Sequence, residues 1–359
     1  MNNQPVYVID CGSGSSRLSK YSYHNDGYIH EDLYIPSGII PTLAIALSKD
    51  KQELFIEDLK NALEKLDSNI SRPDYFSSMN LTVGATGGLR KALDEGIVTY
   101  SQVERFKEIL HRQFENAKFV QYSGAEEAEL ELAAVRYIAK HALPGAIPIF
   151  TGGRSGSGSI GVLSCGGSSS QVAYNDLSTK EDKFLSFRTD LIGTMNRLSD
   201  SPTDNKYASL ENSMWQLIKD ESPNFKIRGT FVVIELAGSI GKEAGLADRL
   251  VPKREAVQLI TQHFQTLSLV EGKDNKINLN SGKKGRTESS LSFFAEARRP
   301  LTVIVDGLLN MFSSSATFFF ATSFDIGSSD NVLRAQWPLG VALGELNDSD
   351  ISNKIKSKL

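Results

Sequence analysis

Two short turns of glycine and serine are the residues of this sequence best suited to hold a phosphate. The first turn lies in VIDCGSGSSRL, residues 8–18, and a second copy lies in VLSCGGSSSQV, residues 162–172. Each turn joins two strand-like runs, so its backbone N–H groups and hydroxyls surround a small concavity without bulky side chains. One such turn is more often an ordinary tight hairpin. Two matching copies favour two related lobes that grip one polyphosphate from both sides.

Acidic residues at strand and helix ends add candidates for a cation ligand and a general base. Asp10 ends an apolar strand, where an unpaired carboxylate is costly to bury, so it needs a metal, water or donor, or it caps the turn. Glu127, with Glu126 beside it, begins a predicted helix whose apolar stripe points Glu127 toward the packed side. The alternative is that both glutamates only favour a helix N-terminus.

The elements that position these residues alternate between strands and helices, which predicts an α/β fold. Leucines at helical spacing predict a helix from Leu54 to Leu66, and further helices are predicted at 125–141, 251–267 and 290–299. The predicted strands are 80–84, 147–150, 160–164, 170–174, 230–236, 302–306 and 318–324. Residues 151–161 are expected to form a hairpin loop, and residues 271–287 a solvated excursion.

Length and composition limit the domain number and the class of protein. The 359 residues fit two domains, and we expect 1–148 as the first lobe, completed by a C-terminal helix at about 338–359, and 149–337 as the second. A net charge of −4 argues against a general binder of nucleic acid or of membrane surfaces. Without a signal peptide or a long apolar run, the chain is expected to be cytoplasmic, although export by a dedicated secretion system would leave no such signal.

Five stretches, in order along the chain, resemble motifs of the actin-like ATPase superfamily. They are similar to those of the apyrase (nucleoside triphosphate diphosphohydrolase) family and of its exopolyphosphatase and guanosine pentaphosphate phosphohydrolase relatives. The stretches are DCGSGSSR at 10–17, GATGGLR at 84–90, SGAEEA at 123–128, CGGSSSQ at 165–171 and WPLG at 337–340. Segments 232–245 and 297–312, and Ala128, are more similar to exopolyphosphatases. The resemblance implies two actin-like (ribonuclease H-like) lobes with a nucleotide or phosphate cleft between them.

The resemblance also implies a role for each motif residue in phosphoanhydride hydrolysis, which needs an oriented water, a base and cations. It implies that Glu127 is the base and that Thr86, Ser169 and Gln171 orient the water. Asp10 would hold Mg²⁺ or Ca²⁺ through water. The implied phosphate-binding residues are Ser13, Gly14, Ser15, Arg90, Gly166, Gly167 and Ser168, with a structural salt bridge as the alternative for Arg90.

Relatives of the apyrase type hold the nucleotide base between aromatic side chains from the C-terminal half of the chain. The candidates for this role are Phe319, Phe320, Phe324 and Trp337, of which we select Phe324 and Trp337. The alternative is that FFFATSFD is a core strand, as such runs usually are in α/β proteins.

The second turn departs from the pattern of both families at Ser164, where they carry Asp. A neutral serine removes one metal-directed carboxylate, so cation affinity should fall unless another group, such as Asp190, replaces it. The leading expectation is a metal-dependent hydrolase that releases terminal phosphate from nucleoside tri- and diphosphates such as ATP and ADP. The alternatives are an exopolyphosphatase or guanosine pentaphosphate phosphohydrolase, and a nucleotide-binding regulator with little turnover.

Overall fold

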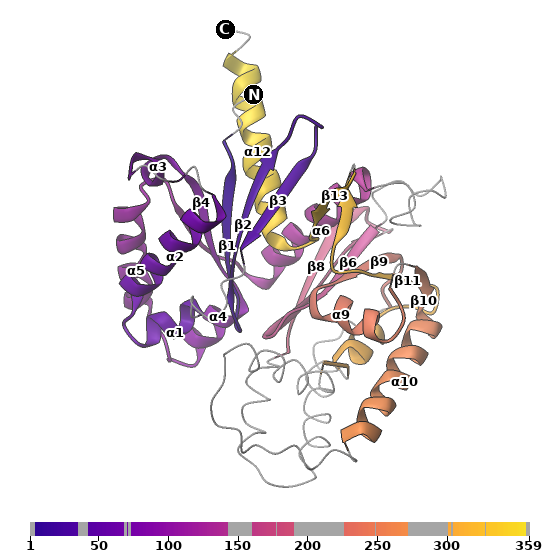
Figure 1. Ribbon diagram of the computed structural model, residues 1–359. Coiled ribbons are helices and arrows are strands. Elements are labelled where there is room, and N and C mark those ends of the chain that lie inside the picture. The colour runs from indigo at the N-terminus through magenta and orange to yellow at the C-terminus, as the bar shows by residue number, and fades with distance from the viewer. Residues whose placement is uncertain are drawn as a thin grey trace. The chain divides into compact units, whose positions relative to one another are not determined.

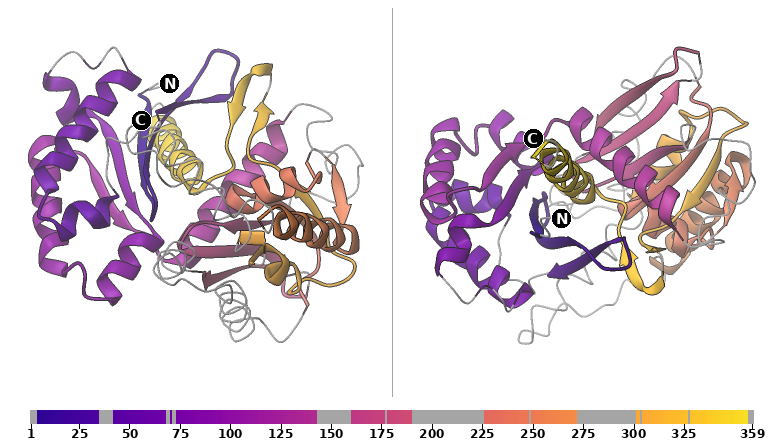
Figure 2. Two further views of the ribbon diagram at one scale, coloured as in Figure 1. Left: turned by 60° about the horizontal axis from the view of Figure 1, so that its bottom comes forward. Right: turned by 90° about the horizontal axis from the view of Figure 1, so that it is seen from above.

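A computed structural model of the chain forms two compact units, each with its own sheet (Figures 1 and 2). Unit 1 combines Met1–Leu143 with Ser323–Leu359, and unit 2 is Pro144–Thr322. The sequence-based division assigned 149–337 to the second lobe, and the limits of the two domains as independently folding pieces stay a prediction. The structure describes residues 4–34, 42–67, 70, 73–142, 160–176, 178–189, 226–247, 249–271, 301–302, 304–326 and 328–356.

Unit 1 is built on a five-stranded sheet with the order β3-β2-β1-β4-β5. Its strands are β1 (Val6–Cys11), β2 (Ser16–Tyr23), β3 (Ile29–Tyr34), β4 (Asn80–Ala85) and β5 (Lys118–Gln121). β1 pairs antiparallel with β2 and parallel with β4. Every residue of β1 is buried, the apolar run Val6–Ile9 and also Asp10 and Cys11, which gives the first turn a rigid base.

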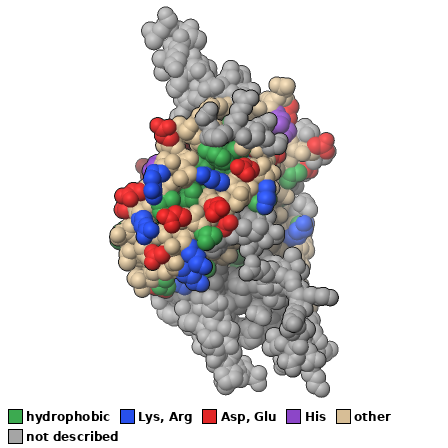
Figure 3. Space-filling view, turned by 60° about the vertical axis from the view of Figure 1, so that its left-hand side comes forward, with side chains coloured by type: hydrophobic (Ala, Val, Ile, Leu, Met, Phe, Trp, Pro, Cys, Tyr) green, Lys and Arg blue, Asp and Glu red, His purple; other side chains and the backbone are tan. Residues whose placement is uncertain are grey.

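Helices cover the sheet of unit 1, and a small two-stranded ribbon completes the unit. The helices are α1 (Leu43–Ser48), α2 (Gln52–Leu66), α3 (Pro73–Ser78), α4 (Gly87–Asp94), α5 (Tyr100–Gln113), α6 (Gly124–His141) and α12 (Trp337–Lys356), and the ribbon is β12 (Phe324–Ile326) with β13 (Ser328–Leu333). α12 packs on β1 and α6, and β13 contacts β3, so the end of the chain belongs to unit 1. On the face of unit 1 seen in Figure 3, basic and acidic side chains are interspersed.

Unit 2 repeats the strand order of unit 1, with one extra edge strand. The order of its sheet is β10-β11-β9-β6-β7-β8. The strands are β6 (Ile160–Cys165), β7 (Ser169–Asp176), β8 (Glu181–Arg188), β9 (Thr230–Ile234), β10 (Leu250–Pro252) and β11 (Thr317–Phe320), and the labelled helices are α9 (Glu235–Glu243) and α10 (Lys253–Glu271). β6 pairs antiparallel with β7 and parallel with β9, as β1 does with β2 and β4. The predicted α/β fold with two repeated sheets is therefore confirmed.

The strand predicted at 302–306 is wrong, because this segment is helical. Residues 301–302 and 304–309 lie in a helix. Leu301, Ile304, Val305 and Leu308 are all buried, at the spacing of one helical stripe. The predicted strand 230–236 ends at Ile234, and 318–324 divides between β11 and β12. The predictions for 147–150, 271–287 and 290–299, and most of the loop 151–161, lie outside the described residues.

Among the described residues, no helix combines the length and apolar character needed to span a bilayer.

Candidate functional site

The first glycine-serine turn connects β1 to β2 and carries a paired carboxylate. Asp10 is 3% exposed, and its carboxylate lies 2.6 Å from the guanidinium of Arg17, its cross-strand partner. Gly14 and Ser15 are exposed at the tip, while Ser13 is half-buried. The turn therefore has an exposed tip that follows a buried carboxylate whose charge Arg17 neutralises.

The start of α4 lies directly against this turn. A Cβ on Gly88 would be 2.7 Å from the Cα of Ser13, so only glycine allows the helix to approach so closely. Thr86 is the N-cap of α4, yet its side chain makes no capping hydrogen bond. The unpaired N–H groups of a helix N-terminus attract anions. The first turn and the N-terminus of α4 thus lie against each other.

Arg90 of α4 joins the second motif to the third. Its Nη1 lies 2.8 Å from the carboxylate of Glu127, and the same guanidinium donates a hydrogen bond to the carbonyl of Tyr122. The side chain of Glu127 is 7% exposed, whereas that of Arg90 is 22% exposed. Arg90 therefore has the structural salt bridge that was its alternative role, and it holds the proposed base in place.

The structure separates the two adjacent glutamates by their hydrogen bonds. Glu126 is exposed and forms a capping box with Ser123: its carboxylate accepts a hydrogen bond from the Ser123 N–H at 2.7 Å. This backbone hydrogen bond lowers the pKa of Glu126. Glu127 is buried beside Arg90. Glu126 thus caps the helix, and Glu127 is the member of the pair placed among the other motif residues.

The fifth motif packs the last helix against the first unit. A Cβ on Gly84 would overlap the indole of Trp337, whose ring centroid lies 5.1 Å from that of Tyr122. A Cβ on Gly340 would overlap the backbone of Leu130 in α6. The motif therefore fixes α12 against β4 and α6 at close distance.

The aromatic residues considered for base stacking are buried where the structure places them. Trp337 is 3% exposed and Phe324 is 4% exposed. Phe319 and Phe320, in β11, are 1% and 0% exposed. All four side chains are thus buried, and for the three phenylalanines this agrees with the core alternative that the sequence left open.

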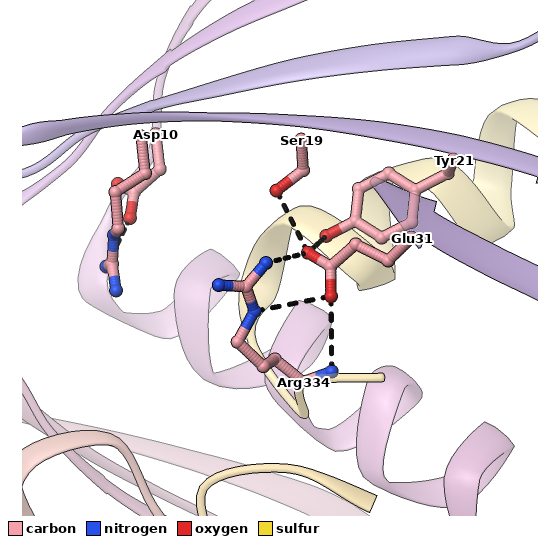
Figure 4. Close-up of polar contacts among 6 residues, drawn as sticks. Asp10, Ser19, Tyr21, Glu31 and Arg334 are labelled. Carbon is pink, nitrogen blue, oxygen red and sulfur yellow. Dashed lines mark hydrogen bonds and ion pairs between the residues drawn. The ribbon is translucent and has the colours of Figure 1, made fainter. Parts of the chain in front are cut away.

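A buried ion pair attaches the segment before α12 to the β2–β3 hairpin (Figure 4). Arg334 lies 2.7 Å from the Glu31 carboxylate, which also accepts hydrogen bonds from the hydroxyls of Ser19 and Tyr21 at 2.9 Å. Figure 4 shows Asp10 apart from this group, on the same sheet. The Glu31 group therefore stabilises the frame around the first turn, and Asp10 is not part of it.

The second turn connects β6 to β7 and repeats the first without its ion pair. Ser164 is fully buried and lies opposite Gln171, the positions at which unit 1 has Asp10 and Arg17. The amide of Gln171 donates to the Ser169 hydroxyl at 2.8 Å. Half-buried residues form the tip: Gly166, Gly167 and Ser168. The second turn thus has a neutral cross-strand pair where the first turn has a charged one, and both residues of the pair differ between the turns.

The sequence-based prediction of site residues did not include two charged residues that lie beside the turns. Arg17 follows the first turn, and its role was hidden because the motif was interpreted through Asp10 alone. Glu235 follows the buried strand β9, and one of its carboxylate oxygens lies 3.5 Å from the Cβ position of Gly166. An acidic residue directly after the apolar run FVVI was the signal that could have found it. Asp190, the substitute named from the sequence, lies outside the described residues.

The donor chemistry at the turns fits a hard cation held through water. Asp10 and Glu235 each bring one carboxylate to a turn, and Mg²⁺ and Ca²⁺ prefer oxygen ligands. Within the described part of the chain, no group of three or more His, Cys, Asp or Glu side chains surrounds a metal position. Few protein ligands are expected for Mg²⁺, which keeps several waters and binds phosphate oxygens.

Comparison with known proteins identifies the fold. A scan against protein-family models gives no match, and no curated protein matches the sequence significantly. Among solved structures, a Ppx/GppA family member from Aquifex aeolicus is 15% identical, with a TM-score of 0.57 over 96% of this chain and 98% of that chain. An exopolyphosphatase from Cytophaga hutchinsonii is 13% identical, with a TM-score of 0.53 over 88% and 94%. A nucleoside triphosphate hydrolase from Neospora caninum is 11% identical, with a TM-score of 0.51 over 95% and 91%. The chain therefore has the actin-like α/β fold of these enzymes.

Proposed function

We propose that this chain is a metal-dependent phosphoanhydride hydrolase that releases terminal phosphate from nucleoside tri- and diphosphates. One observation carries the proposal: a buried glutamate, Glu127, is held by Arg90 of the helix that starts against the first turn. A carboxylate kept out of bulk water and held by the helix that starts at this turn has surroundings suited to a general base. The likeness in fold to phosphatases and NTP hydrolases supports the same class of reaction.

In this proposal each motif residue has one chemical task. Glu127 takes a proton from the attacking water as its oxygen bonds to the terminal phosphorus. The bond from that phosphorus to the bridging oxygen breaks, and the shortened phosphate chain leaves with the electron pair. Thr86, Ser169 and Gln171 orient the water. The phosphates bind to backbone N–H groups and hydroxyls at Ser13, Gly14, Ser15, Gly166, Gly167 and Ser168.

A divalent cation, Mg²⁺ or Ca²⁺, would neutralise charge that develops on the phosphates when it is bound. Asp10 would hold it through water. Arg17 limits the net negative charge beside the phosphates, because it already neutralises Asp10. The role of Arg90 in this proposal is to position Glu127.

Inorganic polyphosphate is the second candidate substrate, and one observation favours it. The aromatic residues considered for base stacking are buried, so they give no support to a stacking platform for a nucleotide base. An enzyme of this kind would recognise its substrate through phosphates and discriminate weakly among bases. The likeness in fold to exopolyphosphatases supports this alternative. A regulator with little turnover would bind the same ligands without releasing phosphate.

A panel of substrates tests the proposal directly. Phosphate release is measured with ATP, ADP, GTP, tripolyphosphate, long-chain polyphosphate and guanosine pentaphosphate, each with Mg²⁺, with Ca²⁺ and with EDTA. We expect metal-dependent release that Glu127→Gln abolishes, with similar rates for ATP and GTP. Release from polyphosphate alone would replace the nucleotide proposal by the exopolyphosphatase one. Tight nucleotide binding without release from any member would favour the regulator.

A further inference from the structure

Both turns carry one carboxylate oxygen at the same place, although the two carboxylates come from different elements. In unit 1 the Cβ position of Gly12 lies 3.1 Å from the carbonyl oxygen of Ser15 and 3.9 Å from Oδ1 of Asp10. In unit 2 the Cβ position of Gly166 lies 3.4 Å from the carbonyl oxygen of Ser169 and 3.5 Å from Oε2 of Glu235. The repeat aligns Gly12 with Gly166 and Ser15 with Ser169. Glu235 therefore lies as close to the glycine of the second turn as Asp10 lies to the glycine of the first.

Ser164 is at the strand position that corresponds to Asp10, but it cannot replace that carboxylate. Its side chain is fully buried, and among the described residues its hydroxyl has no hydrogen-bond partner. The residue opposite, Gln171, brings no positive charge that would stabilise an acid there. Glu235 is half-buried whereas Ser164 is fully buried, so a charge at residue 235 costs less to desolvate than a charge at residue 164.

The backbone holds Glu235 next to the second turn. Ile234 pairs with Ser164 in parallel strands, and Glu235 forms an isolated bridge with Cys165. Glu235 has a φ of 58°, a left-handed conformation that glycine adopts readily and a glutamate does not. The chain thus keeps an acidic side chain at a position where glycine would be less strained.

We infer that Glu235 supplies the acidic oxygen of the second turn and holds water of the cation that accompanies the phosphates. The inference rests on the proposed function, because it concerns the same cation and substrate. The Glu235 carboxylate lies beside the turn that follows the buried Ser164, and carboxylate oxygen is a preferred donor to Mg²⁺, Ca²⁺ and Mn²⁺. In this inference, the acidic group that residue 164 lacks is supplied by Glu235, at the junction of β9 and α9.

The test measures Mn²⁺ binding to the full chain by calorimetry and by electron paramagnetic resonance, with a β,γ-methylene analogue of ATP present. For Glu235→Gln we expect a 10- to 100-fold weaker Mn²⁺ affinity, the range typical for loss of a group that holds a metal's outer shell. Half-saturation of phosphate release by Mg²⁺ should rise to the same extent. Glu243→Gln, in the same helix and paired with His263, is the matched control and should bind Mn²⁺ like the parent.

Glu235→Gly separates the metal role from a structural one. Glycine suits the φ of 58°, so this variant should melt no lower than the parent while losing the same Mn²⁺ affinity. Parent-like Mn²⁺ affinity in both variants would overturn the inference, and so would a Glu235→Gly variant with a lower melting temperature and unchanged affinity. Failure of the proposed function would look different, because the parent chain itself would then release no phosphate and bind no Mn²⁺ with the analogue.

Discussion

Removal of the Arg90 guanidinium should destabilise unit 1 more than removal of its partner's charge. Arg90→Met keeps most of the apolar stem but leaves the Glu127 carboxylate buried without the cation 2.8 Å away. Glu127→Gln keeps the shape and neutralises the carboxylate, while Arg90 stays partly solvated and still donates to the Tyr122 carbonyl. Comparison of the two variants therefore tests whether the buried Glu127 carboxylate needs Arg90 for its stability more than Arg90 needs Glu127.

The distances and exposures set the size of the effect. Coulomb's law gives about 6 kcal/mol for unit charges 2.8 Å apart at an effective dielectric constant of about 20. Breaking a buried pair from one side costs about 3–5 kcal/mol, and the 22% exposure of Arg90 favours the lower end. We expect a loss of about 3 kcal/mol in the free energy of unfolding for Arg90→Met and about 1–2 kcal/mol for Glu127→Gln.

Urea unfolding followed by circular dichroism measures these losses, and phosphate release measures the chemistry. Glu127→Gln should lower kcat by about 10²- to 10⁴-fold while the protein remains folded. Lys91→Met, one residue further along α4, is the matched control. Lys91 lies 3.8 Å from Glu95 at the surface, so its loss should change stability by less than about 0.5 kcal/mol.

The double variant Arg90→Met with Glu127→Gln provides a further check, because it leaves no unpaired charge. It should be more stable than Arg90→Met alone. If Arg90→Met is no less stable than Glu127→Gln, the carboxylate does not depend on the guanidinium. If Glu127→Gln is folded and nearly as active as the parent, Glu127 is not the base.

Two further comparisons between variants test the packing of the turns. Ser164→Asp should lower the free energy of unfolding by about 3 kcal/mol or more, because it buries a carboxylate opposite Gln171. Adding Gln171→Arg should recover part of that loss, because it copies the Asp10–Arg17 pair. Both effects are measured by urea unfolding, and an unchanged midpoint for Ser164→Asp would contradict the burial of residue 164. Gly88→Ala should lower the free energy of unfolding by about 1–3 kcal/mol and raise KM, since its Cβ would meet Ser13 at 2.7 Å. Gly344→Ala is the control: its Cβ would lie in open space, so its stability should be unchanged or higher. Equal melting temperatures for the two variants would refute the close approach of α4 to the turn.

Much of unit 1 could be predicted because its signals are local. A strand, a glycine-serine turn and a returning strand are written in consecutive residues, and the capping box at Ser123 marks where α6 begins. The glutamate pair was also interpretable, since the apolar stripe of α6 separates the buried Glu127 from the exposed Glu126. In each of these cases neighbours in sequence decide the environment of the side chain.

The errors and omissions involve contacts between residues far apart in sequence. The run at 302–306 has only three consecutive apolar residues, at 303–305, and so short a run has no periodicity that distinguishes a buried strand from a buried helix. Trp337 has an aromatic ring that could stack on a base. Its indole instead packs in the core against Gly84, some 250 residues earlier in the chain, where the absence of a Cβ leaves space for the ring. Glu235 reaches the second turn through a parallel strand pairing that the sequence does not encode locally.

The two turns also explain why a repeated motif can change its charge without losing its shape. A buried carboxylate and its cross-strand arginine are tolerated together, while either alone leaves an uncompensated charge. Asp10 with Arg17 and Ser164 with Gln171 are the two combinations free of such a charge, and both keep the strand pairing of the hairpin. An acid at residue 164 would therefore require an arginine at 171, where the chain instead has an amide that donates to Ser169. With that amide in place, a carboxylate for the second turn has to come from outside the hairpin, and the half-buried Glu235, at the start of α9 directly after the adjacent strand β9, is placed to supply it.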